Sequence, residues 1–234
     1  MAHDTGLGRD RGSRRQQLSE DVASYVRELI VSGAARPGEF LRMEPIAEAV
    51  GVSNTPAREG LLSLRGEGFV RLVPRRGFVV APFSRQDVHD LFWSQAQLAG
   101  ELAARAAKNI TAARLDRLAA LVEQYSASIT NDDEAGLVEL GHTFHREINF
   151  AAESDRLALL LGSVVKQLPN RFYAAIEGKI SSAHDEHPLI LEALRNRKSQ
   201  RARALMEQHV LESADHLIEM LDARGLWSED RSAS

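Results

Sequence analysis

The sequence predicts a mainly α-helical protein in which an N-terminal winged helix-turn-helix, with a small β-hairpin wing, precedes a C-terminal antiparallel all-helical bundle. Three observations lead to this prediction. Two short helical patterns meet at a tight turn, an alternating apolar segment with arginines at its centre follows them, and from residue 84 onward the strand signals disappear. A length of 234 residues, with 44% hydrophobic and 26% charged residues, is typical of a soluble globular protein.

The sequence excludes a membrane span, a secretory signal and all cysteine chemistry. No apolar run approaches the roughly 20 residues that span a bilayer, and the first residues lack the apolar centre of a secretory signal. We therefore expect a cytoplasmic location and no membrane partner. The sequence has no cysteine, which excludes disulfides, thiolate zinc sites and cysteine nucleophiles. A metal would have to be held by imidazole, carboxylate or water.

The charges are divided unevenly along the chain. Residues 1–82 hold 12 Arg, no Lys and 10 acidic residues, whereas the remainder holds 17 basic and 23 acidic residues. This division favours a part that faces nucleic acid, joined to an acidic part. Solvated surface charge alone could also produce it.

The N-terminal elements follow from local patterns. Residues 1–16 are polar, without periodicity, and predict a flexible basic arm. A helical apolar stripe begins at Leu18 and stops near Gly33, and two further helical patterns flank a turn at Gly51. Apolar residues then alternate on both sides of a PRRG segment, which predicts a hairpin. Together residues 17–82 form the predicted winged helix-turn-helix, and residues 81–84 its joint to the next domain.

The C-terminal part shows only helical periodicity. Short connections between six such patterns predict an antiparallel bundle over residues 83–223, followed by a flexible tail over 224–234. Thr111 is a predicted N-cap, and Pro169 is expected to bend the fourth helix. The predicted helices cover about residues 85–108, 112–129, 133–152, 155–178, 183–197 and 200–223.

The first turn of the second short helix is polar, and in a helix-turn-helix this turn enters the major groove. Asn can pair with adenine and Arg with guanine, whereas Ser and Thr can hold phosphates. Ion pairing of these arginines at an ordinary surface, with PRRG as a plain turn, is the alternative. The residues expected to contact DNA are Ser53, Asn54, Thr55 and Arg58 on this helix, Arg42 before the first short helix, and Arg75, Arg76 and Gly77 at the hairpin tip.

At these residues the sequence resembles the GntR family of bacterial transcription regulators. The resemblance implies a homodimer that binds a palindromic double-stranded DNA operator. Asn54 stands where the family commonly has Arg, so an operator preference cannot be transferred. The matching motifs are Pro37-Gly38, Leu41-Arg42, Ile46-Ala47, Gly51 to Glu59, Gly68 to Val70, and Arg76 to Val80.

Six of the eight histidines form three pairs in the helical part. Each pair is spaced three or seven residues apart and keeps to one helical face, and the pairs lie on three different predicted helices. Donors that converge from several helices could bind a d-block metal. Polar residues tolerated at the edge of a core are the alternative. The pairs are His142 with His145, His184 with His187, and His209 with His216.

From about residue 84 to 222 the sequence also resembles the helical FCD ligand-binding domain of FadR-type GntR regulators. The motifs are Phe144-His145, then Glu186-His187 with Ile190 to Leu194, then Met206 to His209-Val210. The resemblance implies metal ligands at His145, His187 and His209. Three imidazoles suffice for zinc or nickel and leave coordination positions open.

The resemblance also implies a small-molecule effector, typically an organic acid. Gln95 stands where the first helix of the domain usually has Arg, and Gly141 stands where metal-binding members often have Asp, one turn before His145. His142 is the neighbour that could replace this carboxylate. Arg171, shortly after Pro169, could help to bind the acid, although a surface or interhelix charge is the alternative. The expected effector-binding residues are Arg171, Gln95 and His142.

These expectations describe a ligand-responsive transcription regulator that acts as a repressor. We do not expect an enzyme. Two alternatives stay open. Three histidines around a metal could activate water in a helical hydrolase, although no acidic residue has the spacing of an HExxH-like motif. The chain could also be an architectural DNA binder, in which the bundle serves only dimerisation.

Overall fold

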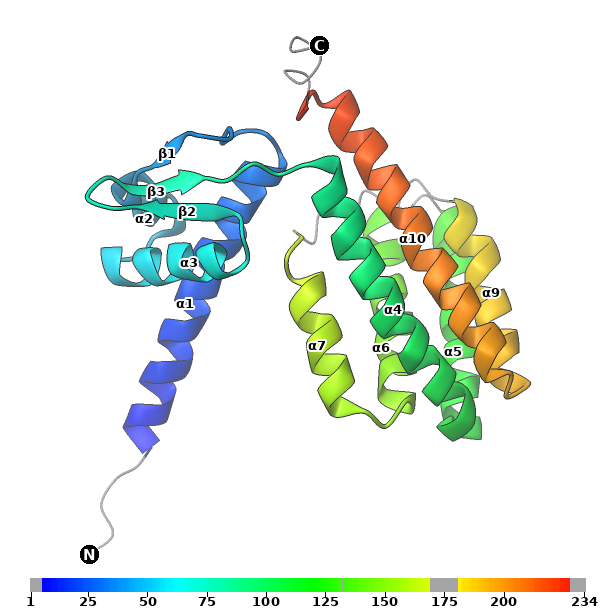
Figure 1. Cartoon of the computed structure of the whole chain (residues 1–234). Coiled ribbons are helices and arrows are strands. Elements are labelled where there is room, and N and C mark those ends of the chain that lie inside the picture. Colours follow the sequence, from blue (N-terminus) through cyan, green and yellow to red (C-terminus); the bar gives the residue numbers. More distant parts are fainter. Residues whose placement is uncertain (1–5, 132, 169–180, 228–234) are drawn as a thin grey trace, which may run out of the picture. The chain divides into compact units, whose positions relative to one another are not determined.

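The computed structural model describes residues 6–131, 133–168 and 181–227. The chain divides into two compact units (Figure 1). The first comprises the described residues up to Ser84, together with those from Leu221 onward, and the second comprises Arg85–Met220. The expectation of a mainly helical chain with a winged N-terminal domain is confirmed.

The first unit is a helix-turn-helix with a small sheet. The expected hairpin is present, with Val70 opposite Val80. A strand that the sequence did not predict extends it, because Phe40 pairs with Val79 and Leu41 with Phe78. A two-residue strand is too short to show alternation. The elements are α1 (Gly6–Val31), β1 (Phe40–Leu41), α2 (Met43–Val50), α3 (Asn54–Gly66), β2 (Val70–Val73) and β3 (Gly77–Val80), and the antiparallel sheet has the order β1-β3-β2.

A glycine allows α1 and α3 to pack closely. A Cβ atom at Gly60 would lie 2.6 Å from the carbonyl oxygen of Ser19 and 2.8 Å from Cγ1 of Val22. Leu61 and Leu64 of α3 are fully buried beside it. A larger residue would push the two helices apart, so Gly60 allows the short distance between α3 and α1.

Two segments expected to be flexible are partly structured. α1 begins at Gly6, so residues 6–16 of the expected arm are helical. Further along α1, the side chains of Arg15 and Ser19 both donate to Glu59 of α3. Trp227, in the expected tail, is buried, and its indole N–H donates to the carbonyl of Phe83 over 2.7 Å. Both segments have a polar composition, so the sequence did not predict these contacts, which form with residues far along the chain.

The second unit is a bundle of helices that lie side by side in Figure 1. Thr111 is the N-cap of α5, as predicted, and accepts from the backbone N–H of Arg114. The fourth predicted helix differs: α7 ends at Val165, and Pro169 and Arg171 lie outside the described residues. The described helices are α4 (Arg85–Asn109), α5 (Ala112–Thr130), α6 (Glu134–Ala151), α7 (Asp155–Val165), α9 (Ser181–Arg195) and α10 (Ser199–Ala223).

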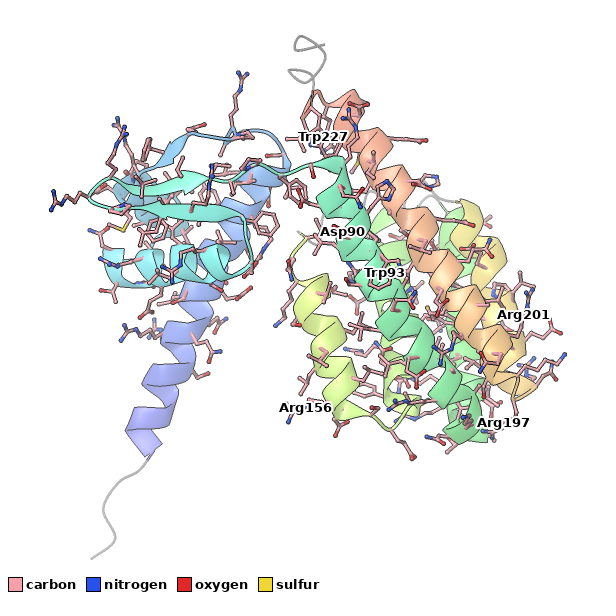
Figure 2. The ribbon with its side chains drawn as sticks, viewed as in Figure 1. Asp90, Trp93, Arg156, Arg197, Arg201 and Trp227 are labelled. Atoms are coloured by element: carbon pink, nitrogen blue, oxygen red, sulfur yellow. The ribbon has the colours of Figure 1, made fainter. Side chains whose placement is uncertain are left out.

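Arg197 ties the end of α4 to the turn between α9 and α10 (Figure 2). Its guanidinium donates to the carbonyl oxygens of Lys108 at 2.8 Å and Ile110 at 2.6 Å. Carbonyls at the C-terminal end of a helix lack partners within the helix, and Arg197 satisfies them. None of the described helices combines the length and hydropathy that a membrane span requires.

Candidate metal centre and nucleic-acid interface

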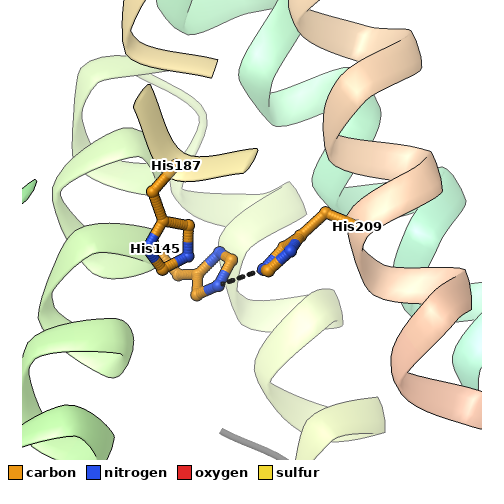
Figure 3. A group of neighbouring side chains, drawn as sticks. All are labelled: His145, His187 and His209. Atoms are coloured by element: carbon orange, nitrogen blue, oxygen red, sulfur yellow. Dashed lines mark hydrogen bonds between the residues drawn. The ribbon is translucent and has the colours of Figure 1, made fainter. Parts of the chain in front are cut away.

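Three histidines from three helices meet inside the second unit (Figure 3). His145 of α6, His187 of α9 and His209 of α10 each offer a ring nitrogen, and these atoms all lie within 4.8 Å of one another. Nε2 of His209 is 3.1 Å from Nε2 of His145. Two nitrogens bound to one tetrahedral zinc are about 3.4 Å apart, because each lies about 2.0–2.1 Å from the ion. The spacing of His145 and His209 therefore suits a shared metal ion.

Aromatic packing holds the three imidazoles in place. His187 stacks on Phe144 with ring centroids 4.3 Å apart, and its ring lies 5.1 Å from that of Tyr125. His145 and His209 lie nearly parallel, with centroids 5.0 Å apart and planes inclined by 20°. Phe144 is itself buried. The residue that precedes His145 thus orients the histidine of a different helix.

One nitrogen of the cluster lacks a partner. Nε2 of His187 is buried and has no hydrogen-bond partner among the described residues. An unsatisfied buried polar group costs about 1–3 kcal/mol. Coordination of a metal ion would satisfy this nitrogen, so the donor set fits the ion that the resemblance implies.

Two imidazoles of the cluster are held in the form that binds metals. Burial, with smaller contributions from His209 and His142, lowers the pKa of His145 to about 3. Burial, with contributions from His209 and His145, also lowers the pKa of His187 well below its ordinary value. Both imidazoles are therefore neutral at physiological pH, and neutral imidazole is the form that coordinates metals.

The metal-free protein is expected to lose stability as the pH falls from 6.5, the ordinary pKa of histidine, toward about 3. In this window the unfolded chain binds a proton at His145 that the folded chain does not, so folding becomes less favourable as the pH falls. One such histidine contributes about 1.4 kcal/mol per pH unit. Urea unfolding of chelator-treated protein between about pH 6 and pH 5 should give a steeper pH dependence for the wild type than for His145→Gln. Equal slopes would contradict this prediction.

Among the side chains that the structure describes, no other histidine joins the donor group. His142 is exposed, and His216 is exposed and contacts the carbonyl of Glu212 through Nδ1. The side chain of His184 lies outside the described residues. Residues three apart on a helix share a face only loosely, and the neighbouring helices decide which one is enclosed. Among the described residues, the donor group therefore contains three imidazoles and no carboxylate.

Gln95 and Arg171 are the remaining expected effector residues. Gln95 is buried in α4, at 4% exposure. Arg171 lies outside the described residues. Glu186 precedes His187 in one of the family motifs, and its Oε2 lies 2.7 Å from Nδ1 of His209. The contact joins residues 23 apart on two helices, and no local spacing could signal it.

The first turn of α3 carries polar side chains that are exposed. Ser53 occupies the N-cap position without a capping hydrogen bond from its side chain. Asn54, Thr55 and Arg58 are exposed. The opposite face of the helix is buried in the first unit, through Pro56, Ala57, Gly60, Leu61 and Leu64.

The hairpin tip and the start of α2 add basic side chains. Arg75, in the turn between β2 and β3, has a positive φ of 63°, and Gly77, the first residue of β3, has a φ of 96°. The guanidinium of Arg76 lies over the ring of Phe40, 4.5 Å from its centroid. Arg42 is exposed at the N-cap position of α2. β1 therefore supplies the ring that holds Arg76, a contact that the sequence did not reveal.

Comparison with known proteins identifies the family. The model for bacterial regulatory proteins of the gntR family matches residues 18–80, and the model for the FCD domain matches residues 90–212. The chain belongs to the GntR family and carries an FCD domain. It is 30% identical, over 181 residues, to the Glc operon transcriptional activator of Escherichia coli K12, a match that covers 69% of this chain and 71% of the relative.

Other relatives are regulators of the same family. The GntR chain described here is 28% identical to the HTH-type transcriptional repressor GlaR of E. coli K12, over 82% of this chain and 92% of the relative. It is 24% identical to the Nta operon transcriptional regulator of Aminobacter aminovorans, over 82% and 91% of the two chains. The protein is therefore a DNA-binding transcription regulator and not an enzyme, which removes the hydrolase alternative.

Solved structures agree with this fold. E. coli McbR/YncC superposes on this GntR chain with a TM-score of 0.60 at 21% identity, covering 88% of this chain and 98% of the other. A GntR family member from Pseudomonas syringae pv. tomato has a TM-score of 0.55 at 22% identity, covering 92% and 97%. At these identities the likeness concerns the fold alone.

Proposed function

We propose that this GntR regulator is a homodimeric repressor that binds a palindromic operator and responds to a small organic acid or related metabolite. The effector binds in the FCD domain beside a divalent metal, zinc or nickel. One observation carries the proposal: three buried or partly buried imidazoles from three helices converge on one point, and Nε2 of His187 has no hydrogen-bond partner among the described residues. The cytoplasmic location expected from the sequence suits such a role.

His145, His187 and His209 would hold the metal. Zinc and nickel both accept imidazole nitrogens, and three protein ligands leave coordination positions open. The bound ion would supply a positive, Lewis-acidic point for an oxygen of the effector. Gln95, Arg171 and His142 are the further effector-binding residues that we propose. The low pKa of His145, about 3, keeps protons from competing for its nitrogen at neutral pH.

DNA reading is assigned to α3 and the wing. Asn54 and Arg58 would contact base edges, and the hydroxyls of Ser53 and Thr55 would hold phosphates. The exposure of these side chains and the missing cap bond of Ser53 support this assignment. Phosphate contacts make such binding salt-dependent. The backbone contacts that we propose come from Arg42, Arg75, Arg76 and Gly77.

Effector control requires different effector affinities in the two states of the dimer, one that binds the operator and one that does not. The relatives include one protein named an activator and one named a repressor. We propose repression, in which the effector favours the state that leaves the operator. An activator would show the opposite sign in the same binding experiment.

The test is operator binding by metal-loaded protein, measured by fluorescence anisotropy at about 150 mM salt. DNA from the region upstream of the gene should bind at least about 1,000-fold more tightly than scrambled DNA. A panel of small carboxylic acids should contain one that weakens operator binding about tenfold, within the usual range of allosteric coupling. No preference over scrambled DNA would overturn the proposal. Preserved preference with no response to any panel member would favour the architectural DNA binder.

A further inference from the structure

We propose that Glu186 positions His209 for metal binding and supplies the negative charge that the three neutral ligands lack. Glu186 acts through His209 and is a positioning residue, outside the donor group itself. The inference rests on the proposed metal site.

The hydrogen bond between these residues decides which nitrogen of His209 faces the cluster. Oε2 of Glu186 lies 2.7 Å from Nδ1 of His209. A carboxylate oxygen can only accept, so Nδ1 of His209 carries the proton and its N–H group donates the hydrogen bond to Glu186. In the neutral ring, the lone pair is then on Nε2. Nε2 is the atom that lies 3.1 Å from Nε2 of His145. Glu186 thereby selects the tautomer that can share a metal with His145.

Burial makes this hydrogen bond effective. The side chains of His209 and Glu186 are only 11% and 14% exposed. A charge-assisted hydrogen bond shielded from water is stronger than one at the surface, and salt screens it less. The carboxylate also raises the electron density on the imidazole, which makes Nε2 a better ligand.

The position of Glu186 in α9 explains how one helix provides both a proposed metal ligand and the partner of a second one. Glu186 and His187 are consecutive, and consecutive residues on an α-helix point about 100° apart. His187 is enclosed beside Phe144 and Tyr125, while Glu186 reaches His209 on α10. A carboxylate outside the ligand set gives a dication partial charge compensation and leaves coordination positions open for an effector.

The experiment compares Glu186→Gln and Glu186→Ala with wild type in the full-length chain. Zinc affinity is measured by competition with a chromophoric chelator. Loss of such an outer partner weakens metal binding by about 10- to 100-fold. We expect this loss for Glu186→Ala and a smaller one for Glu186→Gln, which keeps an acceptor but not the charge. Glu192→Gln, an exposed position on the same helix, is the matched control and should bind zinc as the wild type does.

A second measurement reports on the tautomer without metal. In chelator-treated protein, the ¹⁵N shifts of His209 should show a protonated Nδ1 in the wild type and an increased share of protonated Nε2 in Glu186→Ala. A merely structural role of Glu186 would not move this equilibrium. Circular dichroism of the metal-free variants establishes that they fold.

The outcomes separate the two proposals. Wild-type protein that fails to bind zinc would overturn the metal site and, with it, the role of Glu186. Tight zinc binding by the wild type together with unchanged affinity in Glu186→Ala would overturn only the role of Glu186. An unchanged His209 tautomer in Glu186→Ala would also overturn it.

Discussion

Replacement of His187 by alanine is expected to weaken zinc binding by more than about 100-fold, a larger loss than that of an outer partner. The variant removes one of the three proposed ligands, and the two that remain could not enclose an ion from three helices. His187 is the most deeply buried of the three, at 2% exposure, so water cannot readily replace it. Competition titration with a chelator gives the affinity, and metal analysis of protein purified without added metal gives the occupancy.

A surface histidine provides the control for this variant. His216 lies on α10, as His209 does, but is exposed, so His216→Ala should bind zinc like the wild type. Because His187→Ala also leaves a cavity beside Phe144, His209→Asn is the second test; its side chain is partly exposed and its loss disturbs the core less. Wild-type zinc affinity in both His187→Ala and His209→Asn would contradict the assignment of the metal centre.

Replacement of Arg58 by alanine is expected to cost about 1–3 kcal/mol of operator binding at each half-site, because a bidentate contact with a base is lost. In a homodimer both half-sites lose this contact. Operator affinity should fall by roughly 30-fold or more, while affinity for random DNA changes little. Anisotropy titrations with operator and scrambled DNA, at two salt concentrations, give the affinities for the two DNAs.

Two matched variants make the Arg58 result interpretable. Arg65→Ala removes the same charge from the last turn of α3, away from its N-terminal tip, and should leave the operator preference unchanged. Arg76→Ala should weaken operator and random DNA alike and reduce the salt dependence by about two phosphate contacts, one from each subunit of the proposed dimer. Equal losses on operator and random DNA in Arg58→Ala would place Arg58 on the phosphates instead of the bases.

Periodicity and motif order in the sequence predicted most of the helices well. α5 runs from Ala112 to Thr130, where the sequence predicted 112–129, and Thr111 caps it as expected. Such features depend on neighbours within one or two turns, so local residues specify them. The three histidines of the cluster were also identified, because motifs on three predicted helices placed them.

Contacts between segments that lie far apart in the chain could not be predicted from the sequence. β1 has two residues, which is too short for a pattern, yet it supplies the ring beneath Arg76. Trp227 stood in a polar segment that was expected to be a flexible tail, but it is buried in the first unit. Both cases depend on a partner that lies far along the chain, and the sequence carries no spacing signal for such a partner.

The sequence by itself determined the class of the protein, the polar tip of α3 and the histidines that could bind metal, because residue type at short spacing and the family motifs identify them. Only the tertiary structure showed that the three side chains meet, that His142 stays exposed and that Glu186 reaches His209. The reason is physical. A helix offers several residues on a broad face, and packing against other helices selects which side chain is enclosed and which partner it meets.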